Sequence, residues 1–379
     1  MPDLCFDLPE DLALLRETAR QFAAEHVAPT AKARDLEHRF PREEFARAAE
    51  LGFAGVLVPE EYGGAGLGTL AAALMTEEIS RACASTGVTL SVHNSLMCSP
   101  LVRHATAEQK RRWLPRLASG ELLGAYALSE AGAGSDAAAL ACKAVRRPGG
   151  FTLQGAKLWI TSGNEADLVI VFARAEEGIT AFMVSTDSPG FSVGKVEEKL
   201  GIRSSSTVEI VLDGVAVSDD DVIGGLGKGL RVAFDTLDGG RIGIAAQALG
   251  IAQASLDASL AYAQERKQFG RELSRFQAIQ FKLAQISADL GAARLATWQA
   301  ASLRDAGRPH TLEAASAKLI ASQLANRAAD EAVQIHGGAG YTTEFPVARY
   351  FRDARITEIY EGTSEIQRLV IARQLLGVR

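Results

Sequence analysis

Apolar residues recur at helical spacing over the first third of the chain, from Glu10 to Ala118. Punctuation divides this region into short helices: Pro41 suits a helix start, and Thr106 to Gln109 have the spacing of a capping box. A glycine-rich run at residues 63–66 interrupts the chain. The pattern therefore predicts five or six helices joined by short turns.

The pattern changes after Gly120 to one typical of β-strands. Four short runs rich in β-branched and aromatic residues follow, with turn residues but no long helical pattern between them: residues 151–153, 168–172, 180–184 and 208–212. Strands that follow one another without intervening helices favour a compact antiparallel sheet or barrel over βαβ units.

The helical pattern returns at Leu226 and continues to the end of the chain. Residues 311–335 are rich in alanine and stop at a glycine run, and long helices of this kind pack closely as antiparallel bundles. The chain is therefore expected to be an α+β protein. We predict an N-terminal all-α domain at residues 1–122, a middle β-domain at 123–217 and a C-terminal helical bundle at 218–379.

Composition and charge exclude several classes of protein. The 379 residues are 47% hydrophobic and 23% charged, as in globular proteins, and a formal net charge of −6 argues against a nucleic-acid partner. Cys5, Cys83, Cys98 and Cys142 form no C-x-x-C pair, so neither a disulfide framework nor a zinc site is expected.

The histidines and the N-terminus also argue for a plain, metal-free protein. The six histidines show no H-x-x-x-H spacing, so we expect no metal site. The N-terminus does not have the pattern of a signal peptide, and no apolar run reaches 18 residues. These features predict a cytoplasmic protein without a membrane partner.

The segment with the most chemistry lies near the end of the chain. An apolar run, Ile356 to Tyr360, reads as a strand that stops at Glu361, and Ser364 to Gln367 read as the capping box of a new helix. This helix is expected to bury Ile366, Leu369, Val370 and Leu376. A carboxylate beside free helical N–H groups suits proton transfer next to an anionic cofactor. Taken alone, the segment is better explained by a solvated turn with an ordinary cap, because single carboxylates at turns are common.

Two stretches of the middle region could contact a ligand. Tyr126 to Asp136 place small and hydroxyl residues after a probable strand, but their spacing is not that of a Rossmann dinucleotide site. Trp159 and Thr161 share one face of a strand, which could hold a flat aromatic ring. Burial of Trp159 in the core of the sheet is the alternative.

Two stretches of the C-terminal region could also contact a ligand. Asp238-Gly239-Gly240-Arg241 precedes a long helix and could meet a polar ligand, although Asp238 could simply cap that helix. Arg266, Phe269 and Gln277 bracket a probable break at Gly270, where an arginine could bind a pyrophosphate or only pair with a surface carboxylate.

Together these stretches resemble the acyl-CoA dehydrogenases, a family of flavoproteins, and most closely their short-chain (butyryl-CoA) branch. The resemblance covers nearly the whole chain in order. It is most specific at 126–136, 157–163, 199–203, 263–270, 334–340 and 353–367. It implies the family fold, an N-terminal helical domain, a middle β-domain and a C-terminal four-helix bundle. It also implies FAD as cofactor, an acyl-CoA substrate, an electron-transfer flavoprotein as acceptor and a homotetramer built as a dimer of dimers.

The resemblance also implies roles for individual residues, with Glu361 as the catalytic base. Residues implied to border the FAD in the same chain are Tyr126, Leu128, Ser129, Gly134, Ser135, Trp159, Ile160, Thr161, Thr363, Ser364 and Glu365. Residues implied to reach the FAD of a neighbouring subunit are Arg266, Phe269, Gln277, Gln334, Gly337 and Gly338. Those implied on the substrate side are Ser135, Asp238, Arg241 and Gly362.

The short-chain branch is indicated by two positions at which other branches of the family carry a functional residue that this chain lacks. Isovaleryl and long-chain members resemble this pattern but place the base just before the arginine of the 238–241 segment, where this chain has Gly240. Glutaryl-type members carry an arginine ahead of the Ser-Val pair, where this chain has Gly87 to Leu90 before Ser91. Departures from the family motifs are minor: this chain has Ala131 where the motif often has proline, and Ser162 where the motif often has asparagine.

The reaction that the resemblance implies is α,β-dehydrogenation of a short or short-branched acyl-CoA to the trans-2-enoyl-CoA. Glu361 would take the α-proton while the β-hydride passes to flavin N5. Two alternatives stay open at this point. One is an enzyme that passes electrons to oxygen, as acyl-CoA oxidases do, and the other is a non-catalytic flavoprotein of this fold with a binding role.

Overall fold

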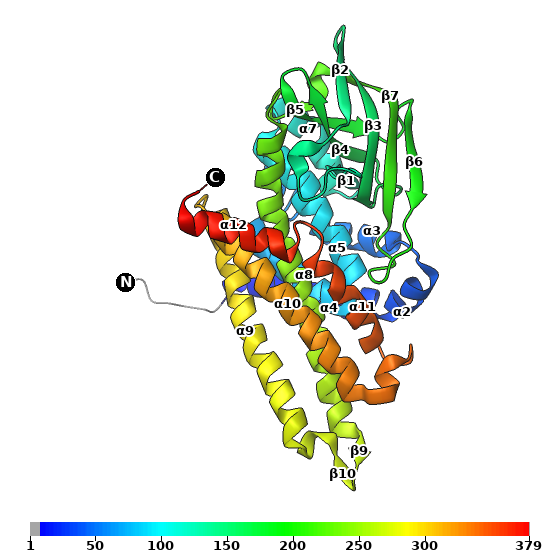
Figure 1. Cartoon of the computed structure of the whole chain (residues 1–379), viewed down its shortest axis with the longest axis vertical. Coiled ribbons are helices and arrows are strands. Elements are labelled where there is room, and N and C mark those ends of the chain that lie inside the picture. The colour runs from blue at the N-terminus through cyan, green and yellow to red at the C-terminus, as the bar shows by residue number, and fades with distance from the viewer. Residues whose placement is uncertain (1–7, 379) are drawn as a thin grey trace.

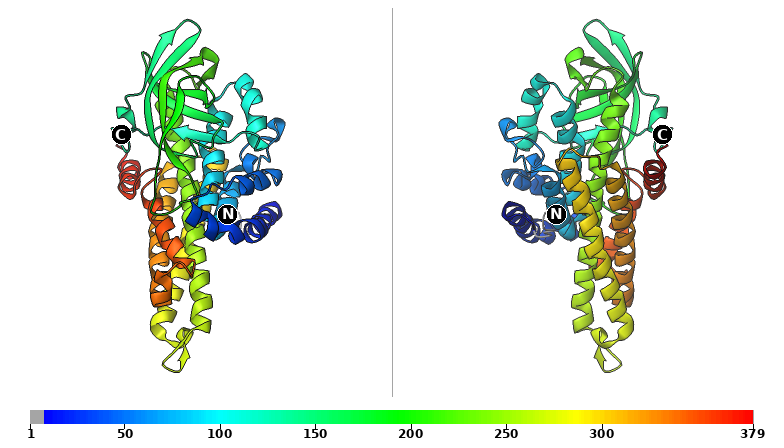
Figure 2. Two further views of the ribbon diagram at one scale, coloured as in Figure 1. Left: turned by 90° about the vertical axis from the view of Figure 1, so that its right-hand side faces the viewer. Right: turned by 90° about the vertical axis from the view of Figure 1, so that its left-hand side faces the viewer.

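The computed structural model describes residues 8–378, so Cys5 and the rest of the N-terminal stretch lie outside the described residues. A β-sheet sits at one end of the molecule, a long helical bundle extends away from it, and the N-terminal helices pack along one side of both (Figures 1 and 2). The predicted order of a helical, a β and a second helical region is confirmed. The exact domain boundaries stay a prediction.

The N-terminal region contains seven α-helices between residues 8 and 122, slightly more than expected, because turns of 3₁₀ and π-helix separate short helical pieces. The predicted capping box at Thr106 is present, since its hydroxyl accepts the Gln109 N–H and the Gln109 side chain accepts the Thr106 N–H. The elements are α1 (Glu10–Phe22), η1 (Ala23–Val27), α2 (Ala28–Glu37), α3 (Arg42–Glu50), η2 (Phe53–Gly55), η3 (Glu60–Tyr62), α4 (Gly68–Ala82), α5 (Ala84–Val92), η4 (His93–Cys98), α6 (Ser99–His104) and α7 (Ala107–Ala118).

The middle region forms one sheet with the strand order β6-β7-β3-β2-β4-β5-β8, and β1 also pairs with β4. Most pairs are antiparallel as predicted, but β1 and β2 both run parallel to β4, because the antiparallel strand β3 follows β2 and brings the chain back before β4 begins. The elements are β1 (Gly124–Ala127), η5 (Ala137–Ala139), β2 (Lys143–Arg147), β3 (Gly150–Thr161), β4 (Leu168–Ala175), β5 (Gly178–Ser185), β6 (Phe191–Val196), β7 (Thr207–Ser218), η6 (Asp219–Asp221) and β8 (Val222–Ile223).

The C-terminal region is built on three long helices, α8, α9 and α10, and the shorter α12 crosses α10 near the sheet (Figure 1). A small hairpin, β9–β10, closes the far end of the bundle. The elements are α8 (Gly229–Glu265), β9 (Lys267–Gln268), β10 (Arg271–Glu272), η7 (Leu273–Arg275), α9 (Gln277–Asp305), α10 (Thr311–His336), η8 (Gly337–Tyr341), α11 (Val347–Ala354), η9 (Arg355–Glu358) and α12 (Ser364–Leu376).

Alanine lets these helices approach closely. Ala314, Ala317, Ala321, Ala325 and Ala328 lie along the inner face of α10 and are fully buried, because a methyl group leaves room for a neighbouring helix at a short interaxial distance. The predicted stop is present as well, since α10 ends at His336, directly before the glycine run. The close packing makes α10 a firm support for the segment that crosses it.

Two predictions about the C-terminal segment were wrong. Ile356 belongs to the 3₁₀-helix η9 and not to a strand, because Ile356 and Tyr360 face the bundle at helical spacing. Thr363, one residue earlier than predicted, caps α12 by accepting the Ile366 N–H.

The predicted apolar face of α12 was wrong for two of its four residues, since Ile366 and Val370 are partly buried but the two leucines are not. Leu369 and Leu376 are 43% and 73% exposed, whereas the polar Gln367 is fully buried. The two buried residues of α12, Ser364 and Gln367, are therefore polar, and these leucines lie on the surface of the described chain.

Candidate functional site

A cavity of about 650 Å³ lies where the three regions meet. Its walls come from the N-terminal helices at Val92 and Leu96, from the sheet at Tyr126 and Trp159, and from the C-terminal segment at Glu361. This volume is in the range of pockets that bind a drug-sized ligand. Residues far apart in the sequence therefore form one site.

The structure brings many of the predicted site residues to this cavity. Those that line it are Tyr126, Leu128, Ser129, Gly134, Ser135, Trp159, Ile160, Thr161, Arg241, Glu361, Gly362 and Thr363. Ser364 and Glu365 follow directly at the start of α12. Arg266, Phe269, Gln277, Gln334, Gly337 and Gly338 are not among the residues that line it, and the first three lie at or beside the hairpin at the far end of the bundle (Figure 1).

A buried ion pair that the sequence analysis missed anchors the loop after β1. Lys157 Nζ lies 2.6 Å from Glu130 Oε1 and donates to the Leu128 carbonyl at 3.1 Å, and the Lys157 side chain is fully buried. The Glu130 carboxylate also accepts the N–H groups of Ala141 and Cys142. The sequence contained one signal, a lysine at an inward position of an alternating strand.

Trp159 faces the cavity and not the core of the sheet. A β-bulge between Lys157 and Ile160 interrupts the pairing with β7, and Trp159 has a left-handed backbone with φ +62°. The indole is 60% exposed in this chain, so burial in the core is excluded. The bulge turns a flat aromatic side chain toward the ligand space.

Glu361 lies in a tight turn between η9 and α12. Its φ is +50° and that of Gly362 is +92°, so two consecutive residues have left-handed backbone. Glu361 Oε2 is buried and has no hydrogen-bond partner among the described residues. Burial raises the pKa of Glu361 to about 7, although the positive charges of Lys318 and Arg241 act in the opposite direction.

The prediction that Asp238 precedes a helix was wrong, because the 238–241 segment lies inside α8. Gly240 makes room for the carboxylate: a Cβ at this position would lie 2.0 Å from Glu361 Oε2. Asp238 pairs with Arg241 and accepts the Thr311 hydroxyl at 2.7 Å, so it orients Arg241, which lines the cavity. The two glycines are needed for close approach within the helix and not for its start.

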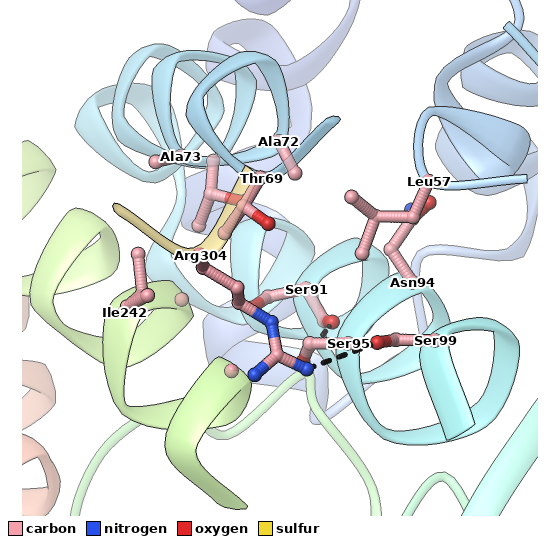
Figure 3. A pocket seen from close by; sticks show the side chains of 13 residues that line it. Leu57, Thr69, Ala72, Ala73, Ser91, Asn94, Ser95, Ser99, Ile242 and Arg304 are labelled. Carbon is pink, nitrogen blue, oxygen red and sulfur yellow. Dashed lines mark hydrogen bonds between the residues drawn. The ribbon is translucent and has the colours of Figure 1, made fainter. Parts of the chain in front are cut away.

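A second, much smaller cavity lies between α8 and the N-terminal helices (Figure 3). Its volume of about 20 Å³ suits a single water molecule. The buried Arg304 side chain points into it and donates to the Ser99 hydroxyl at 3.4 Å (Figure 3). Gly239 and Gly243 line it from α8. Gly239 and Gly243 thus let the backbone of α8 approach this pocket, whereas the neighbouring Gly240 faces Glu361.

The residues present fit a flat, hydrogen-bonding cofactor together with a substrate. Buried polar atoms that lack a partner within the described part of the chain include Tyr126 Oη, Arg241 Nε and Glu361 Oε2, and all three residues line the main cavity. A buried polar atom without a partner is costly unless a ligand supplies one. The indole of Trp159 adds an aromatic wall.

Comparison with known proteins identifies the family. The models of the acyl-CoA dehydrogenase N-terminal, middle and C-terminal domains match residues 9–121, 125–215 and 227–376. The chain belongs to the acyl-CoA dehydrogenase family. It is therefore an FAD-dependent oxidoreductase that dehydrogenates acyl-CoA, as the resemblance predicted.

Individual relatives are similar over nearly the whole chain. The short-chain specific acyl-CoA dehydrogenase of Mus musculus is 50% identical over 375 residues, which cover 98% of this chain and 91% of the relative. Butyryl-CoA dehydrogenase from Megasphaera elsdenii has a TM-score of 0.97 at 42% identity, covering 98% of this chain and all of that one. A chain described with the electron transferring flavoprotein of Acidaminococcus fermentans also has a TM-score of 0.97, at 43% identity and the same coverage.

Other properties of the fold concern membranes and metals. Between residues 8 and 378, no helix is both long and apolar enough to cross a membrane. The same residues contain no cluster of three or more side chains suited to hold a metal ion. Cys83, Cys98 and Cys142 are free thiols buried in the fold.

Proposed function

We propose that the protein dehydrogenates short-chain acyl-CoA thioesters with Glu361 as the base that takes the α-proton. The observation that carries this proposal is the Glu361 carboxylate, which faces the cavity with one oxygen free and a pKa near 7. An ordinary carboxylate is too weak a base for a carbon acid, and burial provides part of the missing basicity. The similarity to short-chain and butyryl-CoA dehydrogenases supports the choice of substrate.

The other cavity residues are proposed to bind and orient the two ligands. Tyr126, Leu128, Ser129, Gly134 and Ser135 would hold the cofactor through the loop that Lys157 anchors, and Trp159, Ile160 and Thr161 would lie against its ring system. Arg241 and Gly362 would contact the substrate, with Asp238 holding Arg241. Thr363, Ser364 and Glu365 would meet the cofactor at the start of α12. Bound FAD supplies the hydride acceptor for the substrate's β-carbon.

The remaining predicted residues support an oligomer. Phe269 is 93% exposed at the far hairpin, and an aromatic side chain in this position is suited to contact another subunit. We propose a homotetramer, built as a dimer of dimers, in which Arg266, Phe269, Gln277, Gln334, Gly337 and Gly338 complete the cofactor site of a neighbour. We further propose an electron-transfer flavoprotein as acceptor, and a cytoplasmic role in fatty-acid β-oxidation.

Anaerobic titration of the holoenzyme tests the substrate and the reaction together. Butyryl-CoA should bleach the flavin absorbance, with isobutyryl-, 2-methylbutyryl-, octanoyl- and glutaryl-CoA as comparisons. A stronger response to octanoyl-CoA would refute the short-chain assignment. Bleaching by none of these thioesters would instead favour a non-catalytic role.

Aerobic turnover with the same substrates separates a dehydrogenase from an oxidase. With an electron-transfer flavoprotein present, reduction of that acceptor should exceed formation of hydrogen peroxide. Peroxide formed in proportion to substrate consumed would show that oxygen is the acceptor.

A further inference from the structure

The turn that carries Glu361 is held by two side chains that converge on one carbonyl. Lys318 Nζ donates to the Gly362 carbonyl oxygen at 2.7 Å, and Gln367 Nε2 donates to the same oxygen at 2.8 Å. Gln367 also reaches the Glu361 carbonyl, at 3.3 Å. Two successive residues with left-handed backbone persist only when their surroundings fix them, and these hydrogen bonds supply that restraint.

Lys318 projects from α10, beneath the turn. The side chain is fully buried, among the alanines of the inner face of the helix. Burial lowers the pKa of Lys318 to about 8, and the nearby charges of Glu361 and Arg241 act in opposite directions on it. A buried ammonium is costly unless it is hydrogen-bonded, so a lysine at this position needs a specific use.

The choice of partner is informative. The Lys318 ammonium donates to a backbone carbonyl and not to the nearby Glu361 carboxylate, whose Oε2 remains free. A direct ion pair would have lowered the basicity of Glu361 and turned its oxygens away from the cavity. Held one residue away, the same cation fixes the backbone while it leaves the carboxylate available.

We propose that Lys318 is a positioning residue for Glu361: with Gln367 it clamps the Gly362 carbonyl, which fixes the direction of the Glu361 carboxylate and places one positive charge behind it. This inference rests on the proposed role of Glu361 as the base. No pattern in the sequence indicates this role, because a single lysine in an alanine-rich helix is usually a solvated side chain.

Charged and titratable groups reach Glu361 from several elements. Lys318 on α10 and Arg241 on α8 bring positive charge, and both favour the ionised carboxylate. Tyr126 on β1 and Tyr360 beside the turn are buried phenols, and the charge of Glu361 raises the pKa of each further than burial alone. Glu358 and Glu365 act on Lys318 from the ends of the turn. Of the two cations, only Lys318 also holds the backbone of the turn.

Three variants of the holoenzyme separate position from charge. Lys318→Met removes both, Lys318→Gln keeps an N–H donor without the charge, and Lys32→Met removes an exposed lysine on α2 as a matched control. The measurement is the rate of flavin reduction by butyryl-CoA in anaerobic stopped flow from pH 5.5 to 9. FAD content and the visible spectrum establish that each variant is folded.

The expected outcomes differ for the three proteins. Lys318→Met should lower the plateau rate about tenfold, because the carboxylate loses its fixed direction. It should also move the acidic limb to higher pH, because the carboxylate loses a nearby cation. Lys318→Gln should keep the plateau within about threefold but still show the moved limb. Lys32→Met should match the wild type in both.

The proposal fails if Lys318→Met keeps the wild-type plateau and the wild-type limb. If Lys318→Met does not retain FAD, Lys318→Gln decides, and an unmoved limb in that variant overturns the proposal. Glu361→Gln separates this result from the identity of the base. Normal flavin reduction by Glu361→Gln would show that Glu361 is not the base. If Glu361→Gln is inactive but the Lys318 variants behave like the wild-type enzyme, only the proposed role of Lys318 is refuted.

Discussion

Two buried lysines lie near glutamates in this molecule, and they use their ammonium groups differently. Lys157 pairs directly with Glu130 at 2.6 Å, and two backbone N–H groups complete the environment of that carboxylate. Lys318 instead donates to the carbonyl beside Glu361 and leaves the Glu361 Oε2 free. The first arrangement anchors a loop, and the second supports a reactive group.

The pKa values follow from this difference. Burial raises the pKa of both carboxyl groups, but hydrogen bonds from Lys157 and the Ala141 N–H reverse the effect at Glu130, whose pKa is lowered overall. Glu361 accepts no comparable bonds, and burial raises its pKa to about 7. The pKa of a buried glutamate therefore does not follow from the proximity of a lysine alone. It depends on whether the ammonium donates to the carboxylate itself or to a neighbouring carbonyl.

Removal of the free carboxylate should have the largest effect. Glu361→Gln should slow flavin reduction by butyryl-CoA about 10⁴-fold, because the amide cannot take the α-proton. The folded protein should nevertheless gain stability at pH 8, since a carboxyl with a raised pKa disfavours the fold once the pH exceeds its unfolded value. Stopped-flow reduction and denaturant unfolding at pH 8 measure the two effects, and loss of stability would contradict the assignment.

Breaking the direct pair should act on stability. Lys157→Met leaves the Glu130 charge buried without its partner and should cost about 3 kcal/mol or more. FAD should also be released more readily, because the loop from Ser129 to Ser135 loses its anchor. Urea unfolding and FAD retention on gel filtration test this, with Lys143→Met, an exposed lysine on β2, as control. An unchanged unfolding midpoint would show that the pair is dispensable.

A smaller effect is expected from filling the space beside Glu361. The Cβ of Gly240→Ala would lie 2.0 Å from Glu361 Oε2 and 3.0 Å from Leu96, so the carboxylate must move and flavin reduction should fall about 100-fold. Gly291→Ala, on α9, is the matched control, because the added Cβ would have no described atom within 4 Å apart from the backbone of its own helix. This control should keep activity and gain up to about 1 kcal/mol in stability. Equal behaviour of the two variants would show that Gly240 does not shape the site.

The pH dependence should give the mildest change. The second-order rate of flavin reduction by butyryl-CoA should fall about tenfold per pH unit below pH 7, because the free enzyme then holds Glu361 protonated. Glu130 stays ionised over this range, since its pKa is lowered, and adds no limb of its own. A profile that is flat between pH 5.5 and 7.5 would contradict the raised pKa of Glu361.

The sequence allowed the order of the three regions, the main strands and much of the cavity lining to be predicted. Thr106 and the stop after His336 follow from local rules that hold wherever the chain folds. Glu361 was found through the family resemblance, because a single carboxylate at a turn has no distinctive pattern. The roles of the site residues stay predictions until variants are measured.

Other features depended on contacts that no local pattern records. Gly239 and Gly240 suggested a helix start, yet α8 continues through them, and glycine is needed there because Arg304 and Glu361 approach the helix backbone. The partners of Lys157 and Lys318, at Glu130 and Gly362, lie far from them along the chain. Long-range partners of this kind become visible only when the elements are placed in space.

The length of α8 has a consequence for the assembled enzyme. This one helix passes beside Glu361 at Gly240 and ends directly before Arg266, next to the hairpin proposed to reach a neighbour's cofactor. It rises roughly 39 Å between these two points. A continuous helix has a fixed length. In the proposed oligomer, α8 would therefore set the distance between the Glu361 site of one subunit and the cofactor of the neighbouring subunit that the hairpin contacts. An inserted helical turn would change that spacing without touching either site.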